Sequence, residues 1–576
     1  MNDRKSVIFI VCVYLLTVFF IPLYDAPRRE VNTNERIRAY LTMALVEDGT
    51  SVVDRQVAEY GLPLDRAEKD GHVYCDKVPG LSFMAIPAYV LILLVESLFS
   101  ARAPFYLIVY ILRVFAVGVP VAVMLFYMVK LLEEHVEEDV AYFCAAVYAL
   151  GTIALPMSTA FFGHQAAAAF SFLAYYAAKK GTVAGRQNLL FISGVLAGVS
   201  VMTEFPTVII AAAIALMVLS AQGRRGRILY YIAGMAPPLA LLLCYNRFTF
   251  GHALDFGYGH TQHYFMLLGL DKTGPSAALG LPSLSTLWHM SFSPYRGFIF
   301  FSPVMLFSLY GLLLLCRQGE KAEAALVGAC ALSYFVFNSM LRDWEGGWSP
   351  GLRHLVPVAP VLVLPLGLAA QAIARSARET LPKKFLAVIF CAASLVSISN
   401  NCLAAMTYIY FPWGVFNPLK DICLTFFKSG VYSLNLLSMW GAPGWAGAIV
   451  ASGIILALIA GFCRNAIGRL LPVVGMKIAV LALVLAWCIF VLLLSPVNTM
   501  DGEKYLALIY WNNRLGKPFL DAGRKIIERS PDREEKIRYA RACIYMACEI
   551  MKEPRRALWF YDIYGAYEGD RGDFTD

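Results

Sequence analysis

Charged residues are scarce in this chain of 576 residues. Asp, Glu, Lys and Arg together make up only 16% of it, whereas 59% of the residues are hydrophobic. Soluble domains usually contain about 25% charged and about 45–50% apolar residues, so the composition argues against a soluble protein. The formal net charge of +8 is spread along the chain without a basic tract. We therefore expect no nucleic acid partner.

Several patterns typical of other protein classes are also missing. The sequence contains no Ser-His-Asp order, no zinc-binding HExxH pattern, no phosphate-binding glycine-rich loop and no internal repeat. Its 13 cysteines include no CxxC pair, and most lie in apolar segments, where cysteine usually serves as a small hydrophobic residue. Four cysteines in loops or the tail remain disulfide candidates with open pairing, namely Cys75, Cys423, Cys543 and Cys548.

Long apolar segments take the place of these patterns. Many approach the ~20 residues that cross a bilayer as a helix. We predict an all-α polytopic membrane protein with about 13 transmembrane helices, counting apolar segments and the basic loops between them. These helices are expected near residues 6–24, 112–130, 139–160, 165–179, 188–204, 206–222, 228–246, 297–316, 322–340, 355–374, 384–404, 444–463 and 474–495.

The basic clusters set the predicted orientation, because Lys and Arg in short loops mark the cytoplasmic side. With residues 3–5 inside, the later basic clusters all fall inside as well, and the C-terminus lies outside. All basic clusters fall on the inside only if the apolar segment 81–99 does not span the bilayer. We therefore expect this segment to lie as a helix in the outer interface. The N-terminal segment is interpreted as an uncleaved span, and the expected location is a bacterial inner (plasma) membrane.

The chain is expected to have two domains. Residues 1–495 would form the membrane domain, including an unusually long first extracytoplasmic loop, about residues 25–111, that bears interfacial helices. Residues 496–576 are richer in charge and show helical periodicity. They are predicted to form a small helical domain outside the membrane that packs on the outer loops.

Acids and bases stand at both ends of the first loop. Glu35 and Arg36 open a helical pattern that Thr33 or Asn34 would cap. This could be a plain interfacial helix, or an acid that activates an acceptor beside an Arg that binds an anion. Asp76 and Lys77 close the loop before Pro79-Gly80. They could anchor the chain at the interface, or hold a hydroxyl or metal and a phosphate.

Four further residues mark the predicted outer ends of spans. His164 lies between two apolar spans, where a lone histidine is more often structural. Glu204 is the sharper candidate, because ionisable residues at a span are costly and often functional. Arg296 and Arg353 each stand at the mouth of a span, and Arg suits bidentate recognition of phosphate.

Three motifs resemble those of the GT-C superfamily of membrane glycosyltransferases, in particular the branch of protein O-mannosyltransferases and aminoarabinose (lipid A) transferases. They are Asn34-Glu35-Arg36 with Tyr40, the segment 74–79, and the Gly-x-Arg-His-Leu-x-Pro run at 351–357. The chain departs from the family pattern at three places. Asn34 replaces an acid, Asp76 replaces a glutamate, and His164 stands where a second-loop aspartate is expected.

The resemblance implies transfer of a sugar from a polyprenyl-phosphate donor to an extracytoplasmic acceptor, which could be a glycan, a lipid or a protein. Lys77, Arg296 and Arg353 would stabilise the phosphate, with Arg36, His164 and Glu204 as further binding residues. Glu35 or Asp76 would take the acceptor proton. A divalent cation held by carboxylate and histidine is an open option. The alternatives are a transporter or flippase of lipid-linked saccharides and a non-catalytic assembly subunit.

Overall fold

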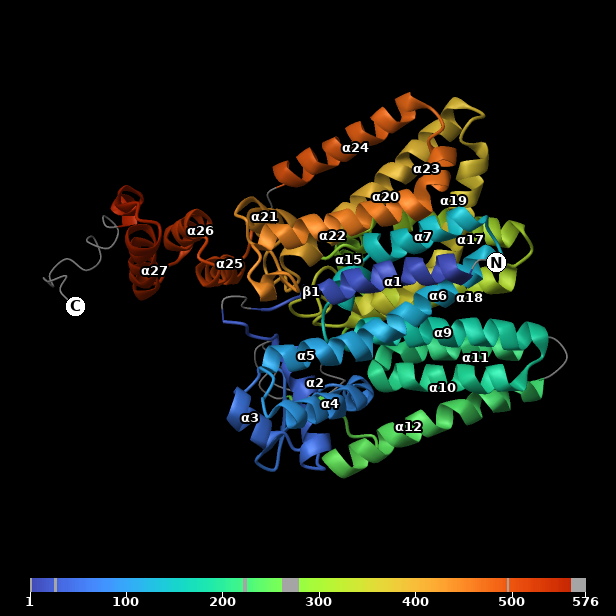
Figure 1. The fold of residues 1–576 in the computed structure, drawn as a ribbon, viewed down its shortest axis with the longest axis horizontal. Coiled ribbons are helices and arrows are strands. Elements are labelled where there is room, and N and C mark those ends of the chain that lie inside the picture. Colours follow the sequence, from blue (N-terminus) through green and yellow to red (C-terminus); the bar gives the residue numbers. More distant parts are fainter. Residues whose placement is uncertain (1–2, 25–27, 221–224, 262–278, 495–496, 561–576) are drawn as a thin grey trace, which may run out of the picture.

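The computed structural model describes residues 3–24, 28–220, 225–261, 279–494 and 497–560. Long helices run side by side through the molecule (Figure 1). They are α1 (Asp3–Phe19), α5 (Phe105–Arg113) continued by α6 (Val119–Glu133), α7 (Glu138–Gly151), α9 (Gly163–Ala184), α10 (Gln187–Thr203), α11 (Val208–Ser220), α12 (Ile228–Phe250), α17 (Phe307–Arg317), α18 (Lys321–Met340), α19 (Val363–Ser376), α20 (Leu381–Thr407), α22 (Gly444–Leu458), α23 (Arg464–Leu470) and α24 (Val474–Leu493).

These helices make the chain an integral membrane protein of the predicted all-α class. Among the described residues, 8 helices are long and apolar enough to cross a membrane, and shorter apolar helices accompany them. A helix occupies each segment in which a span was predicted, although residues 221–222 and 495 of those segments lie outside the described residues. The count of about 13 crossings stays a prediction.

Small residues let neighbouring spans approach closely. A side chain at Gly194 of α10 would lie 2.0 Å from the carbonyl oxygen of Tyr231, and one at Gly234 of α12 would lie 2.0 Å from that of Phe191. Backbone contact of this kind is typical of membrane helices, where dispersion and packing, rather than the hydrophobic effect, hold spans together.

We call the two ends of the bundle the loop end and the N-terminal end. At the loop end, α1 finishes in β1 (Phe20–Ile21), which pairs with β4 (Leu434–Asn435). Beyond it lie α2 (Thr33–Glu47), α3 (Asp54–Tyr60) and a hairpin of β2 (Ala67–Lys69) and β3 (His72–Tyr74) (Figure 1). The predicted first loop is therefore a folded layer over one end of the bundle.

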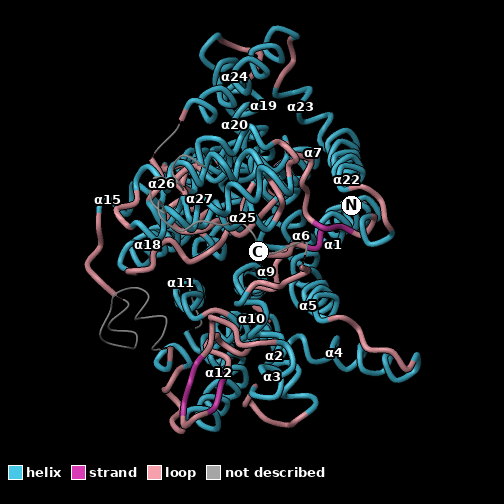
Figure 2. The backbone as a smooth tube through the Cα atoms, turned by 90° about the vertical axis from the view of Figure 1, so that its left-hand side faces the viewer, coloured by secondary structure: helices cyan, strands magenta, loops and turns pink. Residues whose placement is uncertain are grey.

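Helix α4 (Gly80–Phe99) does not follow the direction of the spans. It is long and apolar enough to cross a membrane. In Figure 2, however, the view runs along the spans and α4 is seen from the side, extending outward from the bundle. Its outer residues Leu94, Leu98 and Phe99 are exposed. This orientation agrees with the interfacial helix predicted for residues 81–99.

The C-terminal helices α25 (Met500–Asn512), α26 (Gly516–Arg529) and α27 (Arg533–Tyr545) also lie at the loop end (Figure 1). Leu506 and Ile526 share a buried apolar cluster with Phe411 and Val415 of the segment after α20. The C-terminal helices thus pack on the loops of the bundle, as predicted, and residues 561–576 lie outside the described residues. Of the cysteines left open for disulfides, Cys75, Cys423 and Cys543 are free thiols.

Candidate functional site

Helix α2 positions the first candidate residues. Asn32 caps it by accepting a hydrogen bond from the Asn34 amide at 3.0 Å, a task that the sequence assigned to Thr33 or Asn34. Successive residues of a helix point in different directions, whereas residues four apart share a face. Asn34 and Arg38 share one face, and Glu35 and Arg36 point elsewhere.

Arg38 lies at the centre of the first buried group. Its Nε donates to Asn34 Oδ1 at 3.1 Å, and its Nη2 donates to Glu204 Oε1 at 2.9 Å. The other oxygen of Glu204 lies 3.7 Å from His164 Nδ1. Gly163 makes room for this carboxylate, since a Cβ there would lie 2.3 Å from Glu204 Oε1. Asn34 therefore orients the arginine that pairs with Glu204.

Lys77 lies between two carboxylates. Its Nζ is 2.7 Å from Asp76 Oδ2 and 3.5 Å from Asp65 Oδ1. Burial opposes the charge on Lys77, but both carboxylates raise its pKa. Burial likewise opposes the charge on Asp65, yet Lys77 and Arg353 hold its pKa below its usual value. Burial, assisted by Asp65, raises the pKa of Asp76.

A short loop covers this triad. The Lys77 ammonium lies 5.6 Å from the centre of the Tyr258 ring. A Cβ at Gly257 would lie 2.8 Å from the backbone of Asp76, so the chain at Gly257 rests directly on that residue. Close approach of this kind excludes any side chain at position 257 and shields the Asp76–Lys77 pair from water.

The segment that precedes Arg353 is a tight loop rich in glycine. Gly346, Gly347 and Gly351 all adopt positive φ angles, which favour glycine. The Arg353 guanidinium lies 5.5 Å from the centre of the Phe162 ring. The next residue, His354, packs edge-on against His164 at 5.4 Å between ring centres.

Together these side chains form one polar cluster between α2, the start of α9, the end of α10 and the 346–354 loop, with three cations, three carboxylates and two imidazoles. Its members are Arg38, Asp65, Asp76, Lys77, His164, Glu204, Arg353 and His354. Within the described part of the chain, two of its buried atoms have no hydrogen-bond partner: Asp76 Oδ1 and Arg353 Nε. One can accept a proton and the other can donate a hydrogen bond.

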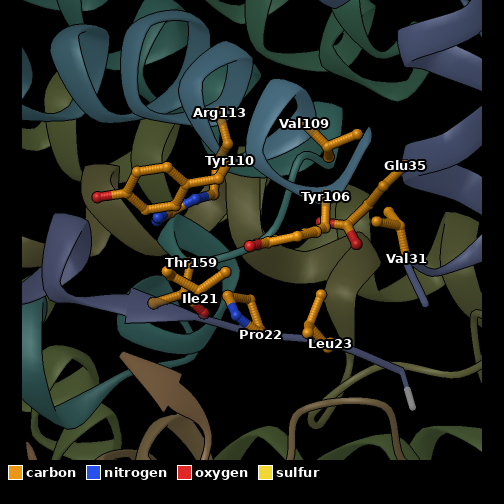
Figure 3. Close-up of a pocket in the computed structure, with 10 residues that line it drawn as sticks. All are labelled: Ile21, Pro22, Leu23, Val31, Glu35, Tyr106, Val109, Tyr110, Arg113 and Thr159. Carbon is orange, nitrogen blue, oxygen red and sulfur yellow. The ribbon is translucent and has the colours of Figure 1, made fainter. Parts of the chain in front are cut away.

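Glu35 lies apart from the polar cluster. Its Oε1 accepts a hydrogen bond from the Phe161 amide at 2.5 Å, and its Oε2 accepts one from the Tyr410 hydroxyl at 2.8 Å. It borders a small cavity of about 10 Å³ that Arg113 also lines (Figure 3). Burial raises the pKa of Glu35 to about 7, against the opposing effect of its two hydrogen bonds.

Two predicted anion-binding arginines also lie outside the polar cluster. The buried Arg296 guanidinium donates to the carbonyl oxygens of Ser349, Gly347 and Phe411 at 2.8–3.2 Å. Its Nη1 and Nη2 thereby hold the loops together, whereas its buried Nε has no hydrogen-bond partner within the described ranges. Phosphate binding by Arg296 stays a prediction. Arg36 points toward α3, where its Nη1 lies 3.7 Å from the Cβ position of Gly61.

The described residues gather few side chains of the kinds that bind metal ions. Across these ranges, no group of three or more His, Cys, Asp and Glu side chains is placed to hold a metal ion. His164 and Glu204 lie 3.7 Å apart, but Glu204 also pairs with the Arg38 guanidinium. The divalent cation considered from the sequence therefore stays a prediction.

Several residues in or beside the polar cluster were not predicted from the sequence. Arg38 was detectable, because it stands four residues after Asn34 and so shares its face. His354 stood inside the quoted 351–357 motif without a role. Asp65 and Tyr258 had no sequence signal, because they meet Lys77 only through the folding of two loops.

No family model and no curated protein match the chain. Among solved structures, it is similar to ArnT from Cupriavidus metallidurans bound to undecaprenyl phosphate, with 13% identity, 98% of this chain and 89% of that chain covered, and a TM-score of 0.41. The apo form of that protein gives 15% identity, 92% and 81% coverage, and a TM-score of 0.44.

The chain is also similar to the archaeal oligosaccharyltransferase AglB from Archaeoglobus fulgidus in complex with dolichol-phosphate. The identity is 12%, with 75% of this chain and 58% of that chain covered and a TM-score of 0.41. At these identities and TM-scores the similarities carry no argument about activity, so the proposed function rests on the residues of the polar cluster.

Proposed function

We propose that this protein is a membrane glycosyltransferase that moves a sugar from a polyprenyl-phosphate donor to an acceptor outside the cytoplasm. The observation that carries the proposal is the pair of unpartnered buried atoms in the polar cluster, Asp76 Oδ1 and Arg353 Nε, among the described residues. A buried carboxylate oxygen and a buried guanidinium nitrogen without partners are costly to folding. An acceptor hydroxyl and a donor phosphate would satisfy both.

The position of the cluster supports a donor that stays in the membrane. Lys77 directly precedes α4, His164 lies at the start of α9 and Glu204 follows the end of α10, so the cluster lies where these helices meet the folded first loop. A polyprenyl tail would remain among the apolar helices while its phosphate reaches Lys77 and Arg353. The basic loops at the other end of the spans favour the cytoplasm for that end, so the loop end would face outside.

In the proposed reaction, the acceptor oxygen forms a bond to the anomeric carbon of the sugar as the bond from that carbon to the phosphate oxygen breaks. The bonding electrons leave with the phosphate, whose growing negative charge Lys77 and Arg353 stabilise. The acceptor hydroxyl proton passes to Asp76. The raised pKa of the buried Asp76 carboxylate suits a base of this kind, since general bases work best with a pKa near the working pH.

Other residues of the cluster would hold Asp76 and Lys77 in place and balance their charges. Asp65 pairs with Lys77, so the ammonium stays compensated while Asp76 takes up a proton. Arg38 and Glu204 form a buried ion pair that joins α2 to the end of α10. The side chains that position and neutralise one another in the cluster therefore come from elements far apart in the sequence.

The test is transfer by the purified protein in detergent, where a transporter has no second compartment to work on. A panel of radiolabelled polyprenyl-phosphate sugars is mixed with an envelope extract as acceptor, and released polyprenyl phosphate is measured. We expect release by the wild type and loss with Asp76→Asn. Asp70→Asn is the matched control, because Asp70 is exposed in the same loop and Asn also tolerates its positive φ.

Three results would contradict the proposal. Equal release by the wild type and Asp76→Asn would remove Asp76 as the base. Movement of the lipid across vesicles without release in detergent would favour the transporter. Full complementation of a deletion strain by Asp76→Asn would favour the non-catalytic assembly subunit.

A further inference from the structure

Glu35 is the buried acid that the proposed reaction does not use. Its carboxylate accepts from the Phe161 amide and the Tyr410 hydroxyl, so both of its oxygens are occupied. The two partners belong to segments more than a hundred residues away along the chain: Phe161 precedes α9, and Tyr410 follows α20. The carboxylate therefore joins three segments at the loop end.

These two partners flank the same aromatic ring. Phe162 directly follows Phe161, and the Tyr410 ring packs edge-on against Phe162 at 6.4 Å between ring centres. A second partner of the Phe162 ring is the Arg353 guanidinium, at 5.5 Å from the ring centre. The contacts thus run from Glu35 through Phe161 and Tyr410 to Phe162 and on to Arg353.

The Phe162 ring is an important neighbour of Arg353. The Arg353 Nε is buried without a hydrogen-bond partner in the described ranges, so the side chain depends on its other contacts for orientation. An arginine over an aromatic face gains about 0.5–2 kcal/mol, which is enough to select one rotamer. Arg353 is also the proposed phosphate ligand, so its orientation sets how well the donor binds.

We propose that Glu35 is a positioning residue for Arg353: it fixes Phe161 and Tyr410, and through them the Phe162 ring on which the guanidinium rests. This rests on the proposed function, and it replaces the alternative in which Glu35 takes the acceptor proton. A donor whose phosphate meets a misplaced Arg353 binds more weakly, whereas proton transfer to Asp76 is little affected.

The first experiment compares three variants at two positions by donor KM and kcat. Glu35→Gln keeps an oxygen for the Phe161 amide and a polar group for Tyr410, so its donor KM should stay within about twofold of wild type. Glu35→Ala loses both contacts, and its donor KM should rise about tenfold with a smaller change in kcat. Tyr410→Phe loses one contact and should lie between them.

Tyr110→Phe is the matched control for Tyr410→Phe. Tyr110 lines the same cavity as Glu35, but its hydroxyl donates to the Val18 carbonyl. The donor KM of the Tyr110→Phe variant should stay at the wild-type value. If Glu35→Ala fails to fold, Tyr410→Phe with this control carries the same comparison.

The second experiment repeats the comparison in an Arg353→Ala background. If Glu35 acts through Arg353, Glu35→Ala should cause no further rise in donor KM there, because interacting residues are not additive. A full additional tenfold rise would overturn the proposal. So would a loss of kcat in Glu35→Gln as large as that of Asp76→Asn with unchanged KM, which would make Glu35 the proton acceptor.

The Arg353→Ala variant alone tests the phosphate assignment of the proposed function, separately from the role of Glu35. If Arg353→Ala itself keeps the wild-type donor KM, the phosphate assignment is wrong whatever the Glu35 variants do. If Arg353→Ala raises the donor KM while Glu35→Ala and Tyr410→Phe do not, the assignment stands and the positioning role of Glu35 is wrong.

Discussion

The two ends of the bundle use the same charged residue types in opposite ways. At the N-terminal end, Lys5 pairs with Glu138 and Lys180 with Glu134, and each of these side chains is about a third exposed or more. At the loop end, the side chains of Arg38 and Glu204 are only 1% and 6% exposed. Exposed pairs are screened by water, whereas buried charges depend on every neighbour.

The difference separates ion pairs that water screens from a buried polar cluster. The N-terminal end has an open hollow between α1, α7 and α23, lined by Lys5, Glu138 and Arg469. The loop end has its charges locked by glycines, at Gly163 beside Glu204 and at Gly257 beside Asp76. A fixed, dry arrangement can stabilise charge that develops during a reaction, and a mobile wet one cannot.

The largest expected effect is that of Asp76→Asn at the loop end. Removing a general base should lower kcat by about 10²–10⁴-fold, since the carboxylate that accepts the proton is lost while the shape is kept. The measurement is single-turnover release of polyprenyl phosphate at saturating donor. A fall in kcat of less than about threefold would place the base elsewhere.

The second effect concerns stability at the same end. Arg38→Met leaves Glu204 buried without its main cation and should lower the free energy of unfolding by about 3–5 kcal/mol. Denaturant unfolding in detergent measures this. Arg38→Met combined with Glu204→Gln should recover part of the loss, because no buried charge is then left alone. A single variant as stable as the wild type would contradict the buried pair.

The third effect is a pH dependence caused by Glu35. Its folded pKa of about 7 lies above the unfolded value of about 4.3, so the protonated form is favoured by folding. Its contribution is complete below about pH 4, is lost as pH rises toward 7, and is constant above that, with a total of about 4 kcal/mol. Thermal unfolding across this range should show the slope in the wild type, and Glu35→Gln should flatten it.

The smallest effect is expected at the N-terminal end. Lys5→Ala removes an exposed pair with Glu138 and should change the free energy of unfolding by about 0–1 kcal/mol. Transfer activity should be unaffected. A loss comparable to that of Arg38→Met would end the contrast between the two ends, and the same denaturant measurement decides it.

Much of the fold was predictable from local pattern. Apolar segments of spanning length became helices, and the basic loops that left 81–99 out of the count agree with the transverse α4. Asp76 and Lys77 were predictable as a pair because they are adjacent. The partners of Arg296 were not predictable, because a sequence does not show that three backbone carbonyls from other loops accept hydrogen bonds from its guanidinium.

The sequence by itself determined that this is a helical membrane protein with its polar chemistry at one end, because hydrophobic length and loop charge are local properties. Only the tertiary structure decided which acid meets which base. Glu35 and Arg38 are three residues apart on α2, yet one faces Tyr410 and the other faces Glu204. Such partners are brought together by packing between distant segments, and no local pattern encodes that packing.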